Sequence, residues 1–266
     1  MTTISELERI SAFVADIEDR AAQRFEPVLG GMALFDDRVP DVHMANHLRL
    51  DPAANLSAAQ VAAEAERVQE SACLGHRRIT IHDDVAGRRL APGLCALGWH
   101  VQRLAVMVLR HAPAAPVATG AVRELRDGSW RPFRKQMLEG DDVEPETIRQ
   151  IDEAIQTLAR AVGSRTFGAI VEGVIASGCD LFSDGRIAQV EAVFTLKPYR
   201  NQGLARAVIW RAVEEARSED HDLIFLIAAD DDWPKGLYDR LGFEEIGYFF
   251  EFSKTDVRPP RREANA

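Results

Sequence analysis

The 266-residue sequence predicts an α/β (α+β) fold, with strands and helices alternating along most of the chain. Three observations lead to this prediction. Apolar residues recur at helical spacing over residues 146–162. Two apolar runs of strand length cover residues 174–182 and 187–196. Between these runs stands Asp184-Gly185, a dipeptide typical of β-hairpin turns.

The second half of the chain gives an orderly succession of elements. Its pattern predicts a strand, two helices, three strands, a helix, a strand, a short helix and a last strand. Ser129 is a suitable N-cap for the first of these helices, and Gly242 is suited to end the last. The predicted elements cover residues 121–125, 129–139, 146–162, 166–171, 174–182, 187–196, 203–218, 223–228, 235–241 and 243–253.

The first half has weaker patterns. It predicts helices at 3–25, 58–71 and 88–97, and strands at 31–35, 46–50, 78–81 and 100–109. The Ala- and Pro-containing stretch 111–116 has the composition of a linker. We therefore expect one domain over residues 1–115, a second over 116–256, and a polar, flexible tail at 257–266.

Composition narrows the function classes. The net charge of −10 argues against non-specific nucleic-acid binding, which requires a cationic surface. Three widely spaced cysteines make no disulfide framework and no zinc pattern. His43 and His47 have helical metal spacing without an accompanying Glu pattern, so we expect no metal. No signal-like or membrane-spanning run is present, which predicts a cytoplasmic protein without a membrane partner.

An anion-binding turn is predicted where the strand 187–196 gives way to a helix. The segment Arg200-Asn201-Gln202-Gly203-Leu204-Ala205 combines a tight turn with the first amides of that helix. Those amides have no intrahelical partners, and the helix dipole favours a negative charge beside them. The residues alone leave open an ordinary strand-to-helix turn.

A second motif, Gly236-Leu237-Tyr238-Asp239-Arg240-Leu241-Gly242-Phe243, follows some thirty residues later. Together the two motifs resemble the GNAT N-acyltransferase superfamily over roughly residues 122–252. The resemblance implies a mixed, mostly antiparallel sheet with flanking helices. The run 93–99, Gly-Leu-Cys-Ala-Leu-Gly-Trp, echoes the second motif but has no matching loop. The first half is then a smaller, degenerate GNAT-like domain of a tandem protein, and the CoA site lies in the second half.

The resemblance implies acetyl-CoA as cosubstrate and assigns the residues that bind it. The backbone of Arg200 to Ala205 would hold the pyrophosphate, and Gly203 lets the chain approach closely. The pantetheine arm would pair with Val193, Phe194 and Thr195. Asp231 stands where many relatives have asparagine, and an ionised aspartate only accepts hydrogen bonds. The aspartates at 230–232 are alternatively helix caps or ligands of a cationic acceptor.

Two residues are candidate catalytic groups. Strand alternation puts Gln189, Glu191, Val193 and Thr195 on one face. By resemblance, Glu191 would take the proton from an amine directly or through a water, and a solvent-facing position is the alternative. Tyr238 would protonate the departing CoA thiolate, and a packing aromatic is the alternative.

The sequence therefore predicts an acetyl-CoA-dependent N-acetyltransferase acting on a primary amine of a small molecule or peptide by direct attack. Three alternatives stay open at this point. A mycothiol-synthase-like tandem enzyme has the same layout and differs in its acceptor. A non-catalytic acyl-CoA-binding regulatory protein would bind CoA without turnover. Aminoacyl transfer from tRNA fits the acidic composition poorly. The sequence does not fix the oligomeric state.

Overall fold

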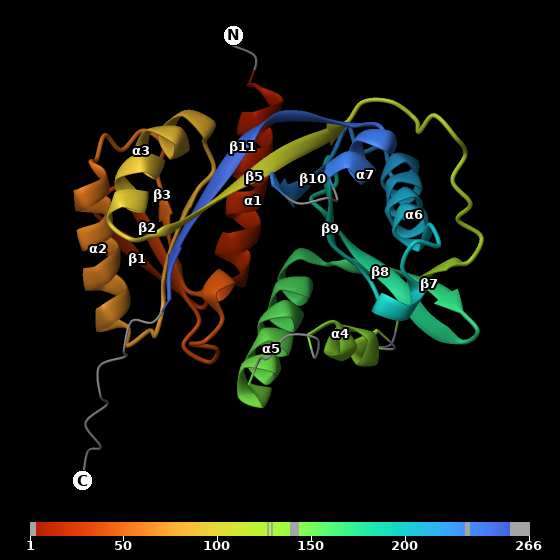
Figure 1. The fold of residues 1–266 in the computed structure, drawn as a ribbon, viewed down its shortest axis with the longest axis horizontal. Coiled ribbons are helices and arrows are strands. Elements are labelled where there is room, and N and C mark those ends of the chain that lie inside the picture. The colour runs from red at the N-terminus through yellow and green to blue at the C-terminus, as the bar shows by residue number, and fades with distance from the viewer. Residues whose placement is uncertain (1–3, 127, 129, 139–143, 232–234, 256–266) are drawn as a thin grey trace.

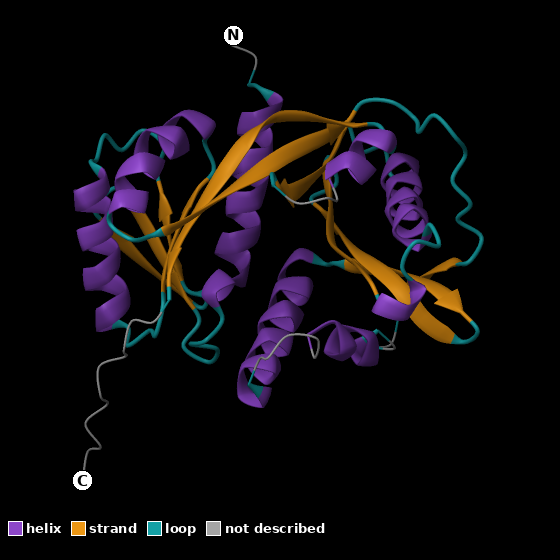
Figure 2. Cartoon of the chain, viewed as in Figure 1, coloured by secondary structure: helices purple, strands orange, loops and turns teal. Residues whose placement is uncertain are grey.

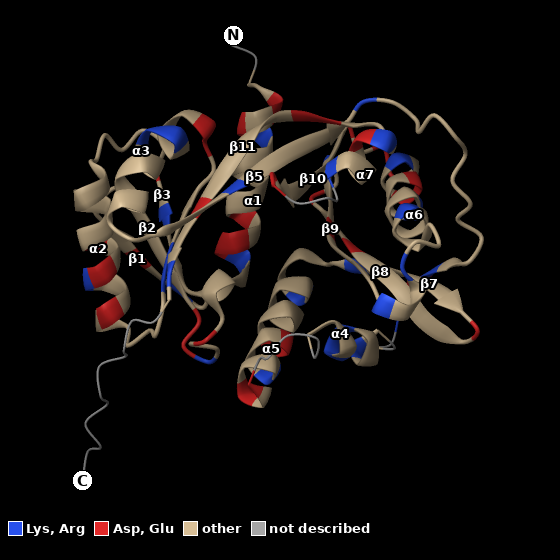
Figure 3. Cartoon of the chain, viewed as in Figure 1, with Lys and Arg blue, Asp and Glu red and all other residues tan. Residues whose placement is uncertain are grey.

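A computed structural model describes residues 4–126, 128, 130–138, 144–231 and 235–255. The described residues form one eleven-stranded sheet with the order β1-β2-β3-β4-β11-β5-β10-β9-β8-β7-β6. Helices lie on both faces of this sheet (Figure 1, Figure 2). Lys and Arg are interspersed with Asp and Glu along α2, α5 and α6 (Figure 3).

The first half contains three helices and five strands among its described residues. Their bounds are α1 (Glu6–Ala21), β1 (Arg24–Val28), β2 (Gly31–Phe35), β3 (His47–Leu50), α2 (Ala58–Ser71), β4 (Arg77–Ile81), α3 (Asp84–Ala96) and β5 (His100–Leu109). Ser5 and Glu8 form a capping box that starts α1. The prediction of a helix over 3–25 was too long, because β1 begins at Arg24. Pro27 is tolerated in β1 since this strand is the edge of the sheet.

The second half has the predicted order of elements. Their bounds are β6 (Val122–Leu125), α4 (Arg131–Leu138), α5 (Pro145–Val162), β7 (Arg165–Val171), β8 (Val174–Ser183), β9 (Ile187–Thr195), α6 (Leu204–Ser218), β10 (Leu223–Ala229), α7 (Lys235–Arg240) and β11 (Phe243–Lys254). The predicted cap Ser129 lies outside the described residues. The predicted mixed α/β fold is confirmed.

The two halves are joined through an exchange of strands that local sequence patterns do not reveal. Strand β5 of the first half lies between β10 and β11, and β11 lies between β5 and β4. Gly242 turns the chain into β11 with φ +94, and a Cβ there would meet the His111 carbonyl oxygen at 2.1 Å. A side chain is therefore excluded at this turn. The division at residues 115/116 stays a prediction, although the sheet runs through both parts.

Each face of the sheet has its own helical layer. Helices α2 and α3 cover one face of the first half, over a core that includes Phe35, Ile79 and Phe252. On the opposite face, α1 and α5 approach each other, and Phe13 packs edge-on against Phe225 of β10. In the second half, α6 packs on the face opposite α5. The space between α1, α5 and the sheet holds the site described below.

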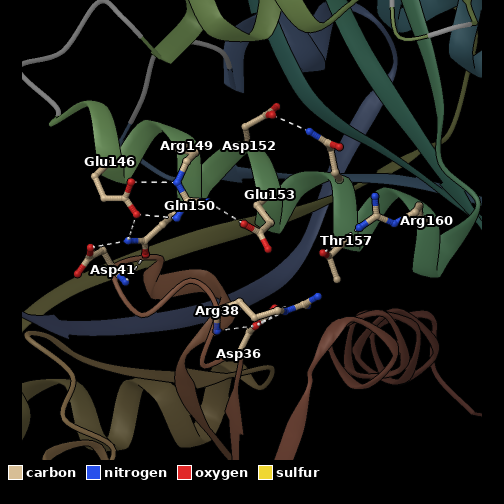
Figure 4. Close-up of polar contacts among 11 residues, drawn as sticks. Asp36, Arg38, Asp41, Glu146, Arg149, Gln150, Asp152, Glu153, Thr157 and Arg160 are labelled. Atoms are coloured by element: carbon tan, nitrogen blue, oxygen red, sulfur yellow. Dashed lines mark hydrogen bonds and ion pairs between the residues drawn. The ribbon is translucent and has the colours of Figure 1, made fainter.

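A polar contact fastens α5 to the first half. The buried Gln150 accepts a hydrogen bond from the backbone N–H of Asp41 at 2.9 Å and donates one to its carboxylate at 2.9 Å. Figure 4 shows Gln150 lying between Asp41 and Glu146. Beside it, Val39 and Val42 pack against Ala154 of α5. The loop that carries these residues thus closes against α5.

We expect Gln150→Ala to lower the free energy of unfolding by about 1–3 kcal/mol, because Asp41 loses two hydrogen bonds in a partly buried setting. Urea unfolding followed by circular dichroism measures this loss. Gln156→Ala is the control on the same helix, since the bonds of Gln156 to Asp152 of α5 and to Arg131 of α4 involve no residue of the first half. Equal losses for the two variants would contradict a bridging role for Gln150.

Candidate functional site

Strand β9 contains a β-bulge at the centre of the candidate site. Gly178 of β8 pairs with Phe194, whereas Asp180 pairs with Glu191, so β9 carries one extra residue here. Ala192 has φ +52, a left-handed conformation uncommon for a residue with a side chain. Bulges change the direction of side chains and leave a residue unpaired.

The bulge corrects the predicted alternation along β9. Residues paired across neighbouring strands share a face, so Phe194 lies on the face of Glu191 with Gly178 and Asp180. Phe194 accordingly packs edge-on against Phe133 of α4, with ring centroids 6.0 Å apart. Gln189 and Glu191 do share a face as predicted. Val193 packs instead against the core under α6, and the predicted grouping of Val193 and Thr195 with Glu191 is wrong.

Strands β9 and β10 separate beyond the first part of β9. They pair in parallel only from Ile187 to Gln189, and β10 continues alongside β5. Within the described residues, the edge of β9 from Glu191 to Thr195 has no strand partner on the β10 side. An open strand edge offers backbone N–H and C=O groups to an extended ligand. On the other side, the Ser177 hydroxyl donates to the Phe194 carbonyl at 2.9 Å and lies 2.8 Å from the Thr195 hydroxyl.

The predicted anion-binding turn connects β9 with α6. Asn201 and Gly203 have left-handed conformations with φ +62 and +77, and Gly203 is the N-cap of α6. No side chain caps this helix. The first helical backbone bond is donated by Ala207 to the Gly203 carbonyl at 3.1 Å, which leaves the preceding amides available. Arg200 folds back, with its Nε donating to the Thr195 carbonyl at 3.3 Å.

Side chains of the turn divide between solvent and core. Gln202 is exposed, while Leu204 and Ala205 pack against the core of the second half. The Arg200 side chain lies beside the end of β9 and leaves the backbone of Gly203 uncovered; a Cβ at that position would meet no atom within 4 Å. The turn therefore presents backbone groups rather than bulky side chains.

A cavity of about 370 Å³ lies between α1, α5 and the sheet, and it contains Glu191. The second half contributes α5, β8, β9, β10 and β11, and the first half contributes α1, β3, β4 and the loop before β3. Apolar side chains form the middle of the wall, among them Ile17, Leu158, Phe182, Ile227 and Phe249. A cavity of this size, mostly apolar with a few polar groups, is typical of small-molecule sites.

Glu191 is poised to exchange a proton in this cavity. Burial raises its pKa to about 6, the charges of Asp180 and Glu251 add to the rise, and hydrogen bonds from Ala192 and Gln189 oppose it. The Gln189 amide donates to the Glu191 carboxylate at 2.6 Å. Glu191 forms no ion pair with any residue in the described part of the chain. A carboxylate with a pKa near 6 is suited to general-base work at neutral pH.

Both carboxylate oxygens of the neighbouring Asp180, by contrast, have side-chain partners. Arg134 of α4 forms an ion pair with it, and the side chains of Arg134 and Asp180 are 7% and 4% exposed. The Thr166 hydroxyl donates to the other carboxylate oxygen at 2.7 Å. The Arg134 guanidinium also lies over the Trp130 ring, 4.5 Å from its centroid. Asp180 therefore contributes a fixed negative charge beside Glu191.

Tyr238 lies apart from the cavity. It is 8% exposed, packs in the core of the second half and stands edge-on to Phe243 at 6.4 Å between ring centroids. Tyr238 belongs to the short helix α7, which follows β10, and it is not among the residues that line the cavity. The structure does not bring Glu191 and Tyr238 into one cavity.

The aspartates after β10 have different surroundings. Asp230 accepts hydrogen bonds from Arg103 Nε at 2.8 Å and from Lys235 Nζ at 2.7 Å. These contacts lower the pKa of Asp230, with the Lys235 bond the largest cause. Asp230 is thus already balanced by two cations. Asp231 is exposed at the end of β10, and residues 232–234 lie outside the described part.

Sequence reasoning missed the contribution of the first half to this cavity. Arg78 and Thr80 of β4, His47 of β3 and Glu18 of α1 all line it. A signal was present, because Arg78, Thr80 and His82 alternate with Ile79 and Ile81 in a strand. Polar residues on one face of a strand are common, however, so this pattern alone does not indicate a site. These residues reach the cavity of Glu191 only through the long-range pairing of β11 with β4.

The described residues contain neither a metal-ligand cluster nor a membrane-spanning helix. Over the described ranges, no group of three or more His, Cys, Asp or Glu side chains is arranged to hold a metal ion. His43 instead stacks on His76, with ring centroids 3.8 Å apart. No helix in the described parts of the chain is long and apolar enough to cross a membrane.

Comparison with known proteins agrees with this architecture. The acetyltransferase (GNAT) family model matches residues 122–243. A GCN5-related N-acetyltransferase from Kribbella flavida has 18% identity and a TM-score of 0.65, over 95% of this chain and 96% of that chain. A functionally unknown conserved protein from Staphylococcus epidermidis has 11% identity and a TM-score of 0.66, over 89% and 95% of the two chains.

A tandem GNAT protein from the clavulanic acid biosynthesis pathway also resembles the structure. It has 16% identity and a TM-score of 0.53, over 77% of this chain and 70% of that chain. At such identities the likeness is one of fold. No curated protein sequence matches the chain.

Proposed function

We propose that this chain, whose residues 122–243 match the acetyltransferase (GNAT) family model, transfers the acetyl group of acetyl-CoA to the amine of a small molecule. The observation that carries the proposal is Glu191. Its carboxylate has a pKa of about 6 and stands in a cavity of about 370 Å³, beside the open edge of β9. The proposed base, the cavity for the acceptor and the strand edge for the donor therefore lie next to one another.

The donor side is proposed to run from the edge of β9 to the turn before α6. The pantetheine arm would pair with the backbone of Val193, Phe194 and Thr195, whose edge is open toward β10. The pyrophosphate would lie on the amides of residues 200–205, at the positive end of α6. Asp231 would lie at the other side of this opening, at the end of β10, as an acceptor of hydrogen bonds.

The proposed chemistry is a direct transfer. The neutral amine attacks the thioester carbonyl carbon, and the C–S bond to CoA breaks as the C–N bond forms. Glu191 takes the proton that the amine nitrogen loses, directly or through a water. The CoA sulfur leaves as a thiolate and receives a proton from the Tyr238 hydroxyl. Products are the acetylated amine and free CoA.

A small molecule fits this site better than a peptide. The cavity is bounded by α1 and α5 on one side and by the sheet on the other, and the Asp41–Gln150 contact closes the loop beside it. The unpaired carboxylate of Glu191 favours a cationic amine over an anionic acceptor.

Calorimetric titration with acetyl-CoA tests the donor site. We expect Gly203→Asp to weaken acetyl-CoA binding at least about tenfold, since a carboxylate at the helix N-terminus repels the pyrophosphate. Gly185→Asp is the matched control. Both glycines have φ near +80 with no atom within 4 Å of a built Cβ, and Gly185 lies in the hairpin between β8 and β9. Absence of binding to the folded parent protein would overturn the proposed function.

We expect Tyr238→Phe to lower kcat about tenfold to a hundredfold while leaving acetyl-CoA affinity unchanged, since the loss of a general acid affects the leaving thiolate. Release of free thiol with a reactive amine measures kcat, and calorimetry measures affinity. Tyr199→Phe, in the turn before α6, is the control. An unchanged kcat would mean that Tyr238 serves only for packing.

Two further assignments form part of the proposal. Residues 1–115 would be a degenerate GNAT-like domain and residues 116–256 the catalytic one, exchanging β5 and β11. A cytoplasmic location is supported by Cys73 and Cys95, which are exposed and unpaired, as is usual in a reducing compartment.

A further inference from the structure

Three buried polar atoms of the first half have no hydrogen-bond partner, and all belong to side chains that line the cavity. They are His47 Nε2, Arg78 Nε and Thr80 Oγ1. His47 and Thr80 are only 3% and 4% exposed. Buried polar groups without a partner are rare in native structures and indicate a missing partner. Two more such atoms among the described residues, on Ser164 and Arg206, lie outside this cavity.

These three side chains lie at the end of the cavity formed by β3 and β4. Arg78 and Thr80 are two residues apart in β4 and so share a face. Thr80 pairs across β4 with Arg49 of β3 and with Glu251 of β11. Glu251 also lines the cavity, so this end faces the same space as Glu191.

The hydrogen-bonding capacities of the three groups define what they would bind. Arg78 Nε can only donate, and the Thr80 hydroxyl can donate and accept. His47 Nδ1 lies 3.1 Å from the Met44 carbonyl oxygen, which can only accept, so Nδ1 carries the hydrogen. In the neutral ring Nε2 is then an acceptor. It lies 3.6 Å from the Glu18 carboxylate, beyond hydrogen-bond reach. A group that both accepts and donates matches this combination: a hydroxyl, or a primary amide that accepts at its carbonyl and donates from its N–H.

The charges in the cavity argue against a carboxylate at that end. Three lining carboxylates already have a guanidinium: Glu18 with Arg49, Asp36 with Arg38, and Glu251 with Arg78. The positive charge of Arg78 is therefore balanced before any ligand enters. The remaining lining carboxylate, Glu191, has no cation in the described part of the chain. A ligand that complements this cavity therefore has one positive charge near Glu191 and an uncharged polar group near Thr80.

From this geometry we propose that the first half selects the acceptor. The acceptor is a small cationic amine with an apolar middle. Its far end carries an uncharged hydroxyl or primary amide, which accepts from Arg78 and Thr80 and donates to His47. Its nitrogen lies at Glu191, and its middle contacts Ile227 and Phe249. This inference rests on the proposed function for the amine end only.

The first test is an acceptor series that differs only at the far end. The probes are hexylamine, 6-aminohexan-1-ol, 6-aminohexanamide and 6-aminohexanoate, each with its four- and eight-carbon homologues. We expect kcat/KM for the best alcohol or amide to exceed that of the matching alkylamine at least about tenfold, since a site with polar groups rejects an analogue that leaves them unpaired. The carboxylate is expected to be the poorest. Equal kcat/KM values for the alkylamine, the alcohol and the amide at every length would overturn the proposal.

The second test assigns the preference to a residue. Thr80→Val keeps the shape of the side chain and removes its hydroxyl, so the ratio of kcat/KM for the alcohol to kcat/KM for the alkylamine is expected to fall about tenfold. Ser164→Ala removes another buried unpartnered hydroxyl outside the cavity and is expected to leave the ratio unchanged. A Thr80→Val ratio equal to that of the parent would contradict the assignment.

Binding without chemistry separates this inference from the proposed function. Thermal shift with the amines alone is expected to give a larger rise in Tm for the alcohol and amide than for the alkylamine. If acetyl-CoA fails to bind but this order is seen, the proposed function fails and the subsite stands. If acetyl transfer occurs without any preference at the far end of the acceptor, the proposed function stands and the proposed subsite fails.

Discussion

Glu191→Gln is expected to lower kcat about a hundredfold or more with an amine acceptor, because a positioned general base contributes roughly 10²–10⁴-fold. The substitution keeps the shape of the side chain and the contact with Gln189. Steady-state release of free CoA measures the loss. Glu244→Gln is the matched control, since Glu244 is an exposed carboxylate of β11 whose side chain is 58% accessible.

The pH profile gives the same prediction a second readout. Because the base must be ionised, kcat of the parent is expected to rise with pH through about 6 and to flatten above it. In Glu191→Gln, the rise of kcat with pH is expected to disappear, and kcat is expected to be low and less dependent on pH. A parent profile without an inflection near this pH, or a Gln variant that retains it, would remove Glu191 from the role of base.

The raised pKa also predicts an effect on stability. A carboxyl whose pKa rises from 4.5 to about 6 on folding favours the folded state when protonated, and its ionisation costs folding free energy. The cost is absent below pH 4.5 and complete above about pH 6, at roughly 2 kcal/mol. Glu191→Gln is therefore expected to unfold at higher urea concentration than the parent at pH 8, and at a similar concentration at pH 4. If the variant is less stable than the parent at pH 8, the ionisation of Glu191 does not cost folding free energy as expected.

The largest loss of stability is expected for Arg134→Met, at about 3–5 kcal/mol, because it leaves the buried Asp180 without its cation. Urea unfolding measures the loss. Arg149→Met on α5 is the control, since Arg149 forms exposed ion pairs with Glu146 and Glu153 and is expected to cost under about 1 kcal/mol.

The double variant Arg134→Met/Asp180→Leu tests the physical reason. Replacing a buried ion pair by apolar groups is often nearly neutral, so we expect most of the loss to be recovered. Equal instability of the single and double variants would show that packing, and not the unpaired charge, causes the loss.

Much of the fold follows from local signals in the sequence. The Asp184-Gly185 turn, the amphipathic residues of α5 and the glycine after α7 each fix an element within a few residues, because turn chemistry and helical periodicity act over short distances. The exchange of β5 and β11 has no local signal. It depends on pairing between residues 100–109 and 243–253, which are far apart in the chain.

The candidate site was predicted in part for the same reason. Glu191 was singled out because the family resemblance implies a general base in that strand. The bulge at Ala192 gave no signal, since alanine is not a residue that marks positive φ. Arg78 and Thr80 alternate with apolar residues, as in any half-exposed strand. Only the pairing of β4 with β11 brings them to the cavity of Glu191.

The position of β11 has a consequence for synthesis of the protein. Residues 77–109 leave the ribosome long before residues 243–254, yet β4 and β5 flank β11 in the finished sheet. The nascent first half must therefore wait with one edge of β4 and both edges of β5 unpaired, a state prone to aggregation. We expect the isolated first half to require a chaperone or an added peptide of residues 243–254 to stay in solution.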